Sequence, residues 1–167
     1  MRTYKNVFTN THKKFLNNIF KFERTPFYLA DSAVKKGDKS FHFVHHAIHD
    51  LGKDNSLLAE PLRLLLKEIS SKINHSCDRI YRCALNITFF NGYTKKCPPH
   101  KDHLFKHKQI LIYLNNSDGD TVVLDKKGKE LKRVKPEAYK IFVFDDSKHY
   151  YYFPKKGVRK VLVYTTN

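Results

Sequence analysis

The second half of the chain is a series of short apolar runs separated by turn-forming residues. This pattern restricts the possible folds more than any other feature of the sequence. The runs are RIYRCALNITFF (79–90), KQILIYLN (108–115), TVVLDKKG (121–128), AYKIFVFDD (138–146) and RKVLVYTT (159–166). Between them lie NGYTKKCPP, NNSDGD, KKGKE and FPKKG, which carry the Gly, Pro, Asn and Asp typical of turns. No helical stripe interrupts the runs, so we predict an antiparallel barrel or jelly roll and not a parallel β-α-β sheet.

The first half of the chain has a different periodicity. Residues 11–22 (THKKFLNNIFKF) place apolar side chains at near-helical spacing, with Thr11 as the expected cap. Residues 56–73 (SLLAEPLRLLLKEISSKI) form a second helical stripe, with Pro61 expected in its first turn. Between these helices, residues 39–50 (KSFHFVHHAIHD) alternate as a strand would, with Phe41, Phe43 and His45 on one face.

These patterns predict one domain that spans residues 1–167. Residues 1–78 are expected to supply helices and a strand as a support region, and residues 79–167 the jelly-roll core. A length of 167 residues is sufficient to bury a core, and neither an internal repeat nor a low-complexity linker indicates a second domain. The fold class expected from the residues is mainly β with amino-terminal helices.

The cysteines and the length of the apolar runs bear on the cellular location of the protein. Cys77, Cys83 and Cys97 are odd in number and lack C-x-x-C spacing, which argues against a disulfide framework or a structural zinc finger. No apolar run approaches the roughly 18 residues that span a bilayer. The start MRTYKNVFTNTHKK also lacks the apolar core of a signal peptide. A cytoplasmic location without membrane contact is therefore expected.

The formal net charge of +16 is high for this length and would attract nucleic acid or another acidic partner. The lysines, however, are scattered through VKKGDK, YTKKCP, LDKKGKELKRVK and FPKKGVRK, with no single basic stripe. Charge alone therefore indicates a specific nucleic-acid function only weakly.

The segment PPHKDHLFKHKQILIYLN (98–115) contains the pattern H-x-D at His100 and Asp102. By itself the pattern is weak, because a chain with 10 His can contain it by chance. Residues two apart on an extended segment point the same way, so both side chains can bind one ligand. With a second imidazole they would form the two-His-one-carboxylate triad that suits non-haem Fe(II). His149, which follows the apolar run YKIFVFDD, is the expected second histidine, and Arg159 opens the last run ten residues later.

The order of these segments resembles a known family. H-K-D, then ILIYLNNSDGDTVVLD, then IFVFDDSKHYYYFPKKGVRKVLVY resemble the catalytic core of the prolyl-4-hydroxylase-like 2-oxoglutarate and Fe(II)-dependent oxygenases. The likeness covers Ile80–Thr166. TPFYLADSAVKKGDKSFHFVHHAIHD and RIYRCALNIT also resemble the amino-terminal part of small, single-domain bacteriophage members of this group. The resemblance implies a double-stranded β-helix, which is a jelly roll, and the host cytoplasm if the chain is phage-encoded.

The resemblance also assigns residues to roles. It implies that the iron ligands are His100, Asp102 and His149. It implies that the groups around the cosubstrate 2-oxoglutarate are Arg159, Tyr113, Thr121 and Asn86. Arg159 would bind the distal carboxylate through its planar fork of donors. Tyr113 would donate to the same carboxylate, and it shares a strand face with Gln109 and Leu111. The chain departs from the family at Val161, where many relatives have Ser or Thr.

The implied activity is that of a dioxygenase. With Fe(II), 2-oxoglutarate and O2 it would hydroxylate a substrate and release succinate and CO2. A protein or peptide side chain ranks first as the substrate, and nucleic acid ranks second. The alternative from another class is a basic jelly-roll module that binds nucleic acid and carries a vestigial triad. Tyr28, Tyr93 and the run HYYYF (149–153) could stack on a base or a peptide ring, although half of them are expected in the core.

Other histidines compete with the triad. HFVHHAIH (42–49) has the spacing of a helical zinc site, but the Phe alternation favours a strand and Asp50 is the only acidic neighbour. A milder hypothesis puts one of these histidines at the mouth of the barrel, against the substrate. His103 and His107 are expected to be solvated loop residues and not ligands.

Overall fold

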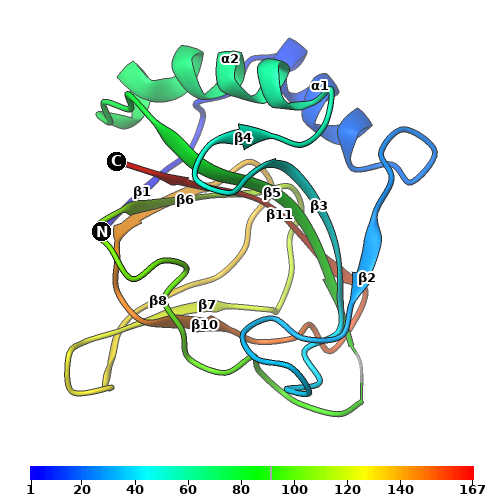
Figure 1. Ribbon diagram of the computed structural model, residues 1–167, viewed down its shortest axis with the longest axis vertical. Helices are drawn as coiled ribbons and strands as arrows, with labels where there is room; N and C mark the ends of the chain where they lie inside the picture. Colours follow the sequence, from blue (N-terminus) through cyan, green and yellow to red (C-terminus); the bar gives the residue numbers. More distant parts are fainter. Residues whose placement is uncertain (91) are drawn as a thin grey trace.

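Two antiparallel β-sheets face each other, and the two α-helices cover the outer face of the larger one (Figure 1). The computed structural model describes residues 1–90 and 92–167; Asn91, in the predicted break at 91–99, lies outside them. The larger sheet has the strand order β1-β9-β6-β11-β5-β3-β2, with β4 paired to β3. The smaller sheet has the order β10-β7-β8. The larger sheet consists of β1 (Arg2–Tyr4), β2 (Tyr28–Ala30), β3 (His42–His49), β4 (Lys53–Asp54), β5 (Ile80–Phe89), β6 (Lys108–Tyr113), β9 (Ile141–Asp145) and β11 (Val158–Thr166). The smaller sheet consists of β7 (Thr121–Leu124), β8 (Glu130–Val134) and β10 (His149–Tyr151).

The first helix starts earlier than the sequence predicts. Helix α1 (Asn10–Ile19) is capped by Thr9, whose hydroxyl accepts the backbone N–H of His12 at 3.2 Å. The imidazole of His12 accepts the backbone N–H of Thr9 in return, at 3.4 Å. The predicted cap, Thr11, is therefore wrong, because a histidine three residues after Thr9 completes the reciprocal capping box.

The second helix matches its sequence pattern closely. Helix α2 (Ala59–Ser70) has Pro61 in its first turn, where a missing N–H is tolerated. A 3-10 turn (Ser71–Ile73) extends it, and Asn74 ends it in the left-handed conformation with φ of 47°. The buried side chains of both helices pack on the outer face of the larger sheet, against Leu85, Leu162 and neighbouring residues.

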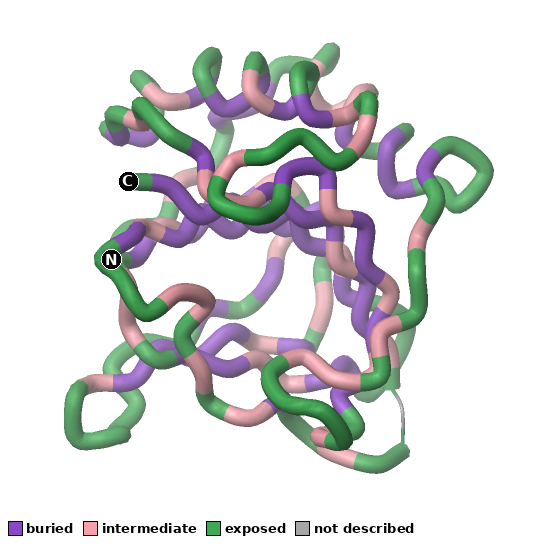
Figure 2. Tube along the Cα trace, viewed as in Figure 1, coloured by how far each residue is buried: buried purple, intermediate pink, exposed green. Residues whose placement is uncertain are grey.

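A second core fills the space between the sheets. It consists of Leu111, Tyr113, Val123, Val134, Phe142, Phe144, Val161 and Val163. Alternation along β11 separates the two cores, since Val161 and Val163 face the interior while Leu162 and Tyr164 face the helices. In Figure 2 the strands of both sheets are largely coloured as buried, and the loops that connect them are largely coloured as exposed.

The structure confirms a mainly β fold with amino-terminal helices and adds strands that the sequence did not reveal. Each run that was predicted as a strand contains a strand. The last strand is one residue longer than its run, and the others are shorter than theirs. Strand β8 was missed because four of its five residues are exposed and it lacks apolar alternation. Strand β10 was missed because it has only three residues. The predicted division at residues 78 and 79 stays a prediction; β3, from the first part, pairs with β5 from the second.

Within the described residues, no helix is both long and apolar enough to cross a membrane.

Candidate metal and cosubstrate site

The two histidines of the predicted triad lie side by side on neighbouring segments. The backbone N–H of His100 donates to the carbonyl of His149, and the reverse bond is also made, each at 2.9 Å. Asp102 follows two residues later and its carboxylate lies between the rings. Its Oδ1 is 3.9 Å from Nε2 of His100 and its Oδ2 is 3.8 Å from Nε2 of His149. Among the described residues, this is the one group of three or more potential metal ligands that meets in space.

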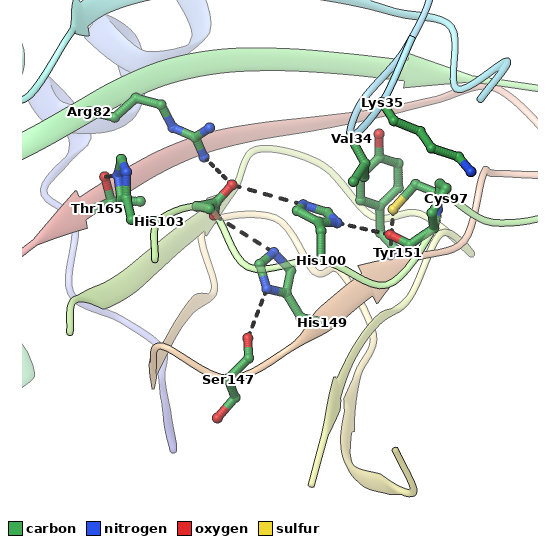
Figure 3. A network of polar contacts seen from close by, with 12 residues as sticks. Val34, Lys35, Arg82, Cys97, His100, His103, Ser147, His149, Tyr151 and Thr165 are labelled. Atoms are coloured by element: carbon green, nitrogen blue, oxygen red, sulfur yellow. Dashed lines mark hydrogen bonds and ion pairs between the residues drawn. The ribbon is translucent and has the colours of Figure 1, made fainter. Parts of the chain in front are cut away.

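Both imidazoles are held with the same nitrogen toward the carboxylate (Figure 3). Nδ1 of His100 lies 2.9 Å from the carbonyl oxygen of Pro98, and Nδ1 of His149 lies 3.2 Å from that of Ser147. A carbonyl only accepts, so each Nδ1 carries the proton and each Nε2 keeps a free lone pair. Such hydrogen bonds orient metal-binding histidines. Burial lowers the pKa of His149 to about 4, so this ring is neutral at pH 7.

The carboxylate of the triad has a cationic partner that the sequence analysis did not identify. An amino nitrogen of Arg82 lies 2.7 Å from Oδ1 of Asp102. Burial opposes ionisation of Asp102, but Arg82 and the two histidines outweigh it and hold the pKa of this carboxyl below its ordinary value. Alternation along β5 could have indicated Arg82, because Leu85 and Ile87 face the helices and residues 82, 84 and 86 therefore face the interior.

The predicted cosubstrate residues meet further along the barrel interior. Arg159 is only 4% exposed. Its Nε donates to the carbonyl of Gly119 at 2.9 Å, and an amino group donates to the hydroxyl of Thr121 at 2.9 Å. The hydroxyl of Tyr113 donates to the same Thr121 oxygen at 2.8 Å. The structure thus brings Arg159, Tyr113 and Thr121 into one hydrogen-bonded group.

A glycine makes this arrangement possible. A Cβ on Gly119 would lie 2.7 Å from the carbonyl oxygen of Tyr152 and 2.9 Å from Cδ of Arg159. Both distances are too short for a side chain, so any other residue would push the arginine away. The guanidinium also lies 4.8 Å from the centre of the Tyr151 ring. Arg159 is therefore held by backbone, hydroxyl and aromatic contacts together.

Asn86 faces the same interior. It lies opposite Val161, which in turn lies opposite Tyr113, so the three residues form one row across the sheet. Oδ1 of Asn86 is buried and has no hydrogen-bond partner. Buried polar atoms are rarely left unpaired, so this oxygen is available to water or a bound molecule. Val161 is fully buried and offers no hydrogen bond from its side chain, as its identity predicts.

The competing histidine cluster does not form. Strand alternation puts His45 on the helix side, where its ring contacts the carbonyl of Pro26 and the hydroxyl of Ser56. His42 and His46 lie on the other face, toward the barrel interior. This fits the hypothesis that one of them lies near the substrate, and burial with nearby Arg82 and histidines lowers the pKa of His46 to about 4. His46 and His49 come close, with ring centroids 4.6 Å apart, but no third potential ligand joins them among the described residues, so the zinc alternative is not supported.

The expectation that His103 and His107 are solvated is wrong. His103 is partly buried, its ring stacks on Phe105 with centroids 4.8 Å apart, and its Nε2 lies 2.8 Å from the hydroxyl of Thr165. His107 is 5% exposed. The loop after Asp102 folds back on the sheet, which buries both rings, and neither belongs to the metal-binding group.

Comparisons with known proteins agree with this architecture. No family model matches the chain, and no curated protein matches it. A 2OG-Fe(II) oxygenase family oxidoreductase from Burkholderia pseudomallei superposes with a TM-score of 0.78 at 17% identity, covering 98% of this chain and 83% of that one. A Pseudomonas putida prolyl-4-hydroxylase has a TM-score of 0.63 at 13% identity, with 99% and 91% covered.

A third solved structure is a prolyl hydroxylase from Trichoplax adhaerens in complex with a hypoxia inducible factor peptide fragment. It has a TM-score of 0.65 at 13% identity, and the match covers 99% of this chain and 82% of that one. The fold of this chain is therefore the double-stranded β-helix that these oxygenases share.

Proposed function

We propose that this chain is an Fe(II)- and 2-oxoglutarate-dependent dioxygenase. The observation that carries the proposal is the convergence of Nε2 of His100, Nε2 of His149 and the carboxylate of Asp102, with N···O distances of 3.9 and 3.8 Å. Two imidazoles and one carboxylate with open positions are the ligand set of non-haem Fe(II) oxygenases. His100, Asp102 and His149 would hold the ion. When bound, the iron with its cosubstrate would supply the oxidising power, because protein side chains alone cannot activate O2.

Arg159 supports the second half of the proposal. A buried guanidinium that contacts only neutral groups has unused capacity for an anion. Among the described residues, its contacts are a carbonyl, a hydroxyl and two aromatic faces, and no carboxylate pairs with it. The distal carboxylate of 2-oxoglutarate would bind to Arg159. Tyr113 and Thr121 would contact it through their hydroxyls, and Asn86 would line the pocket further away. The dry interior would strengthen each of these charge-assisted contacts.

A protein or peptide side chain is the substrate that we propose, with succinate and CO2 as the other products. The fold shared with the two prolyl hydroxylases supports this class. Nucleic acid is the second candidate, favoured by the net charge of +16. A groove of about 750 Å³ adds to it, because its lining combines Phe90, Tyr93 and Tyr152 with Lys95, Arg133 and Lys155.

Anaerobic titration with Fe(II) and 2-oxoglutarate tests the cofactor part of the proposal. A weak visible metal-to-ligand charge-transfer band is expected for the wild-type chain and not for His149→Ala. Absence of the band in the wild type would favour the binding-module alternative. Succinate release in air, followed by mass spectrometry of candidate peptides and oligonucleotides for a gain of one oxygen, then separates the two substrate classes.

A further inference from the structure

Asp102 is joined to the larger sheet by a single arginine. The segment that follows His100 is not part of a strand, so strand pairing does not fix the position of the Asp102 side chain. Arg82, by contrast, lies on β5, which pairs with β11 on one side and β3 on the other. Its amino nitrogen contacts Oδ1 of Asp102 at 2.7 Å, and the two side chains are 22% and 7% exposed. Figure 3 shows Arg82 in the same network of polar contacts as His100 and His149.

The contact makes the two carboxylate oxygens unequal. Oδ1 accepts from Arg82, while Oδ2 faces Nε2 of His149 at 3.8 Å and has no ion pair with an arginine or lysine among the described residues. A carboxylate that used both oxygens on one ion would occupy an additional coordination position. The proposed ligand set must leave positions of the ion open, so a carboxylate restricted to one oxygen would be an advantage.

The surroundings of Arg82 also favour a fixed side chain. Thr165 lies opposite Arg82 on β11, and its hydroxyl is within hydrogen-bond distance of His103. The contact between Thr165 and His103 thus joins the sheet, next to Arg82, to the loop that carries Asp102.

We propose that Arg82 is a positioning residue that holds Oδ1 of Asp102, so that Oδ2 is the oxygen that ligates the metal. The inference rests on the metal site under Proposed function and adds a residue outside the ligand set. Hydrogen-bond partners of metal-binding carboxylates typically contribute 10–100-fold to metal affinity.

Simple electrostatics makes the opposite prediction. A guanidinium beside a cation site repels the incoming ion, so removing its charge should tighten metal binding. Positioning predicts weaker binding after the same change. The sign of the effect therefore separates the two roles.

The test measures Mn(II) affinity of the metal-free full chain by electron paramagnetic resonance, with Mn(II) as an air-stable probe of the triad. Arg82→Met is expected to weaken Mn(II) binding by about 10–100-fold. Arg82→Lys keeps the charge but loses the planar fork, so it should show an intermediate affinity. Lys101→Met is the matched control: it removes one cation between two ligands, and Lys101 is ion-paired with Asp146, away from the triad. The Mn(II) affinity of Lys101→Met should equal that of the wild type or be slightly tighter.

The visible spectrum of the Co(II)-loaded chain is a second measurement. It reports the coordination of the metal, which a purely structural role of Arg82 would leave unchanged. A shift of the ligand-field bands in Arg82→Met is expected, because the coordination of Asp102 changes. Wild-type affinity and spectrum in a folded Arg82→Met, or tighter binding, would overturn the inference. If Arg82→Met does not fold, Arg82→Lys decides, and wild-type affinity there overturns it. Failure of the wild type to bind Mn(II), or equal binding by His149→Ala, would overturn the metal site itself and the inference with it.

Discussion

Hydrogen bonds from outside the triad hold the two imidazoles and the carboxylate in the orientation that the proposed metal site needs. The carbonyls of Pro98 and Ser147 fix which ring nitrogen is free, and Arg82 keeps the carboxylate charged. None of these three partners is a ligand. His42 and His107 are also buried, and their Nδ1 atoms contact the carbonyls of Ser40 and Phe105 in the same way, at 2.9 and 2.8 Å. Among the described residues, the candidate site is therefore set apart by the meeting of two such rings with a carboxylate, and not by ring orientation alone.

Ligand substitutions test this directly. His100→Ala, Asp102→Ala and His149→Ala should each weaken Fe(II) binding by more than about 100-fold, because an open three-ligand site cannot lose a ligand and keep its geometry. His42→Ala and His107→Ala are the controls and should retain iron. Metal content after anaerobic loading and desalting is the measurement. Loss of iron in a control variant, with iron kept in His149→Ala, would show that the ligands are assigned wrongly.

Arg159 and its neighbour Lys160 form a second residue-scale test. Arg159 faces the barrel interior and Lys160 the opposite face of the same strand. Losing one partner of a buried charged hydrogen-bond pair costs about 2–5 kcal/mol, so Arg159→Ala should weaken 2-oxoglutarate binding by tens to thousands of times. Tyr113→Phe removes one neutral donor and should cost about 1 kcal/mol.

Lys160→Ala is the matched control for Arg159→Ala and should leave 2-oxoglutarate affinity unchanged. The measurement is the dissociation constant in the presence of Fe(II) without oxygen. A large loss in Lys160→Ala with a small one in Arg159→Ala would mean that the cosubstrate pocket lies elsewhere.

At the scale of elements, the larger sheet carries most of the site on its inner face. Strands β5, β6 and β11 supply Asn86, Tyr113 and Arg159, and the smaller sheet supplies Thr121 and His149. The sequence predicted the main strands because their apolar faces alternate. It did not reveal β8 or β10, since pairing with β7 and not apolar patterning stabilises them. The triad was predictable from spacing and resemblance. For Arg82 no motif exists, and alternation along β5 could indicate only that its side chain faces the interior, not that it contacts Asp102.

The start of helix α1 gives an element-scale prediction. Thr9→Ala removes the hydroxyl that accepts from His12 and should lower the free energy of unfolding by about 1 kcal/mol. Thr11→Ala, two residues later and without a cap contact, should change it by a few tenths of a kcal/mol at most. Urea unfolding of both variants is the measurement. Equal losses in both would contradict the capping box at Thr9.

At the scale of the whole molecule, buried histidines link folding to pH. The pKa values of His46 and His149 are lowered to about 4, mainly by burial, and those of His42, His75 and His103 are also lowered. The unfolded chain, with ordinary histidine pKa values near 6.5, therefore binds more protons than the folded chain between about pH 6.5 and 4. Stability must fall as the pH is lowered through this window.

Thermal unfolding of the metal-free chain measures this linkage. The midpoint temperature should be nearly constant from pH 8 to 7 and should drop as the pH falls from about 6.5 toward 4. His46→Gln should make the drop shallower, because it removes one group that the folded state keeps neutral. His12→Gln is the control, since this ring contacts Glu68 on the surface. A midpoint that stays constant down to pH 5 would contradict lowered histidine pKa values.

The net charge of +16 supplies the last prediction, which concerns the whole surface. The charge is an excess of 32 Lys and Arg over 16 Asp and Glu, and some of the cations, such as Lys5, Lys101 and Arg133, pair with an acidic side chain. Binding to a 20-nucleotide single strand should be weak and independent of sequence. The logarithm of the binding constant should fall linearly with the logarithm of the salt concentration as counterions are released. Because the remaining lysines are scattered, most of the binding should be lost at physiological salt. Fluorescence anisotropy across a salt series is the measurement, with a peptide of equal length as the comparison. Submicromolar binding that survives physiological salt, and that tightens when Fe(II) and 2-oxoglutarate are added, would make nucleic acid and not a peptide the first candidate substrate.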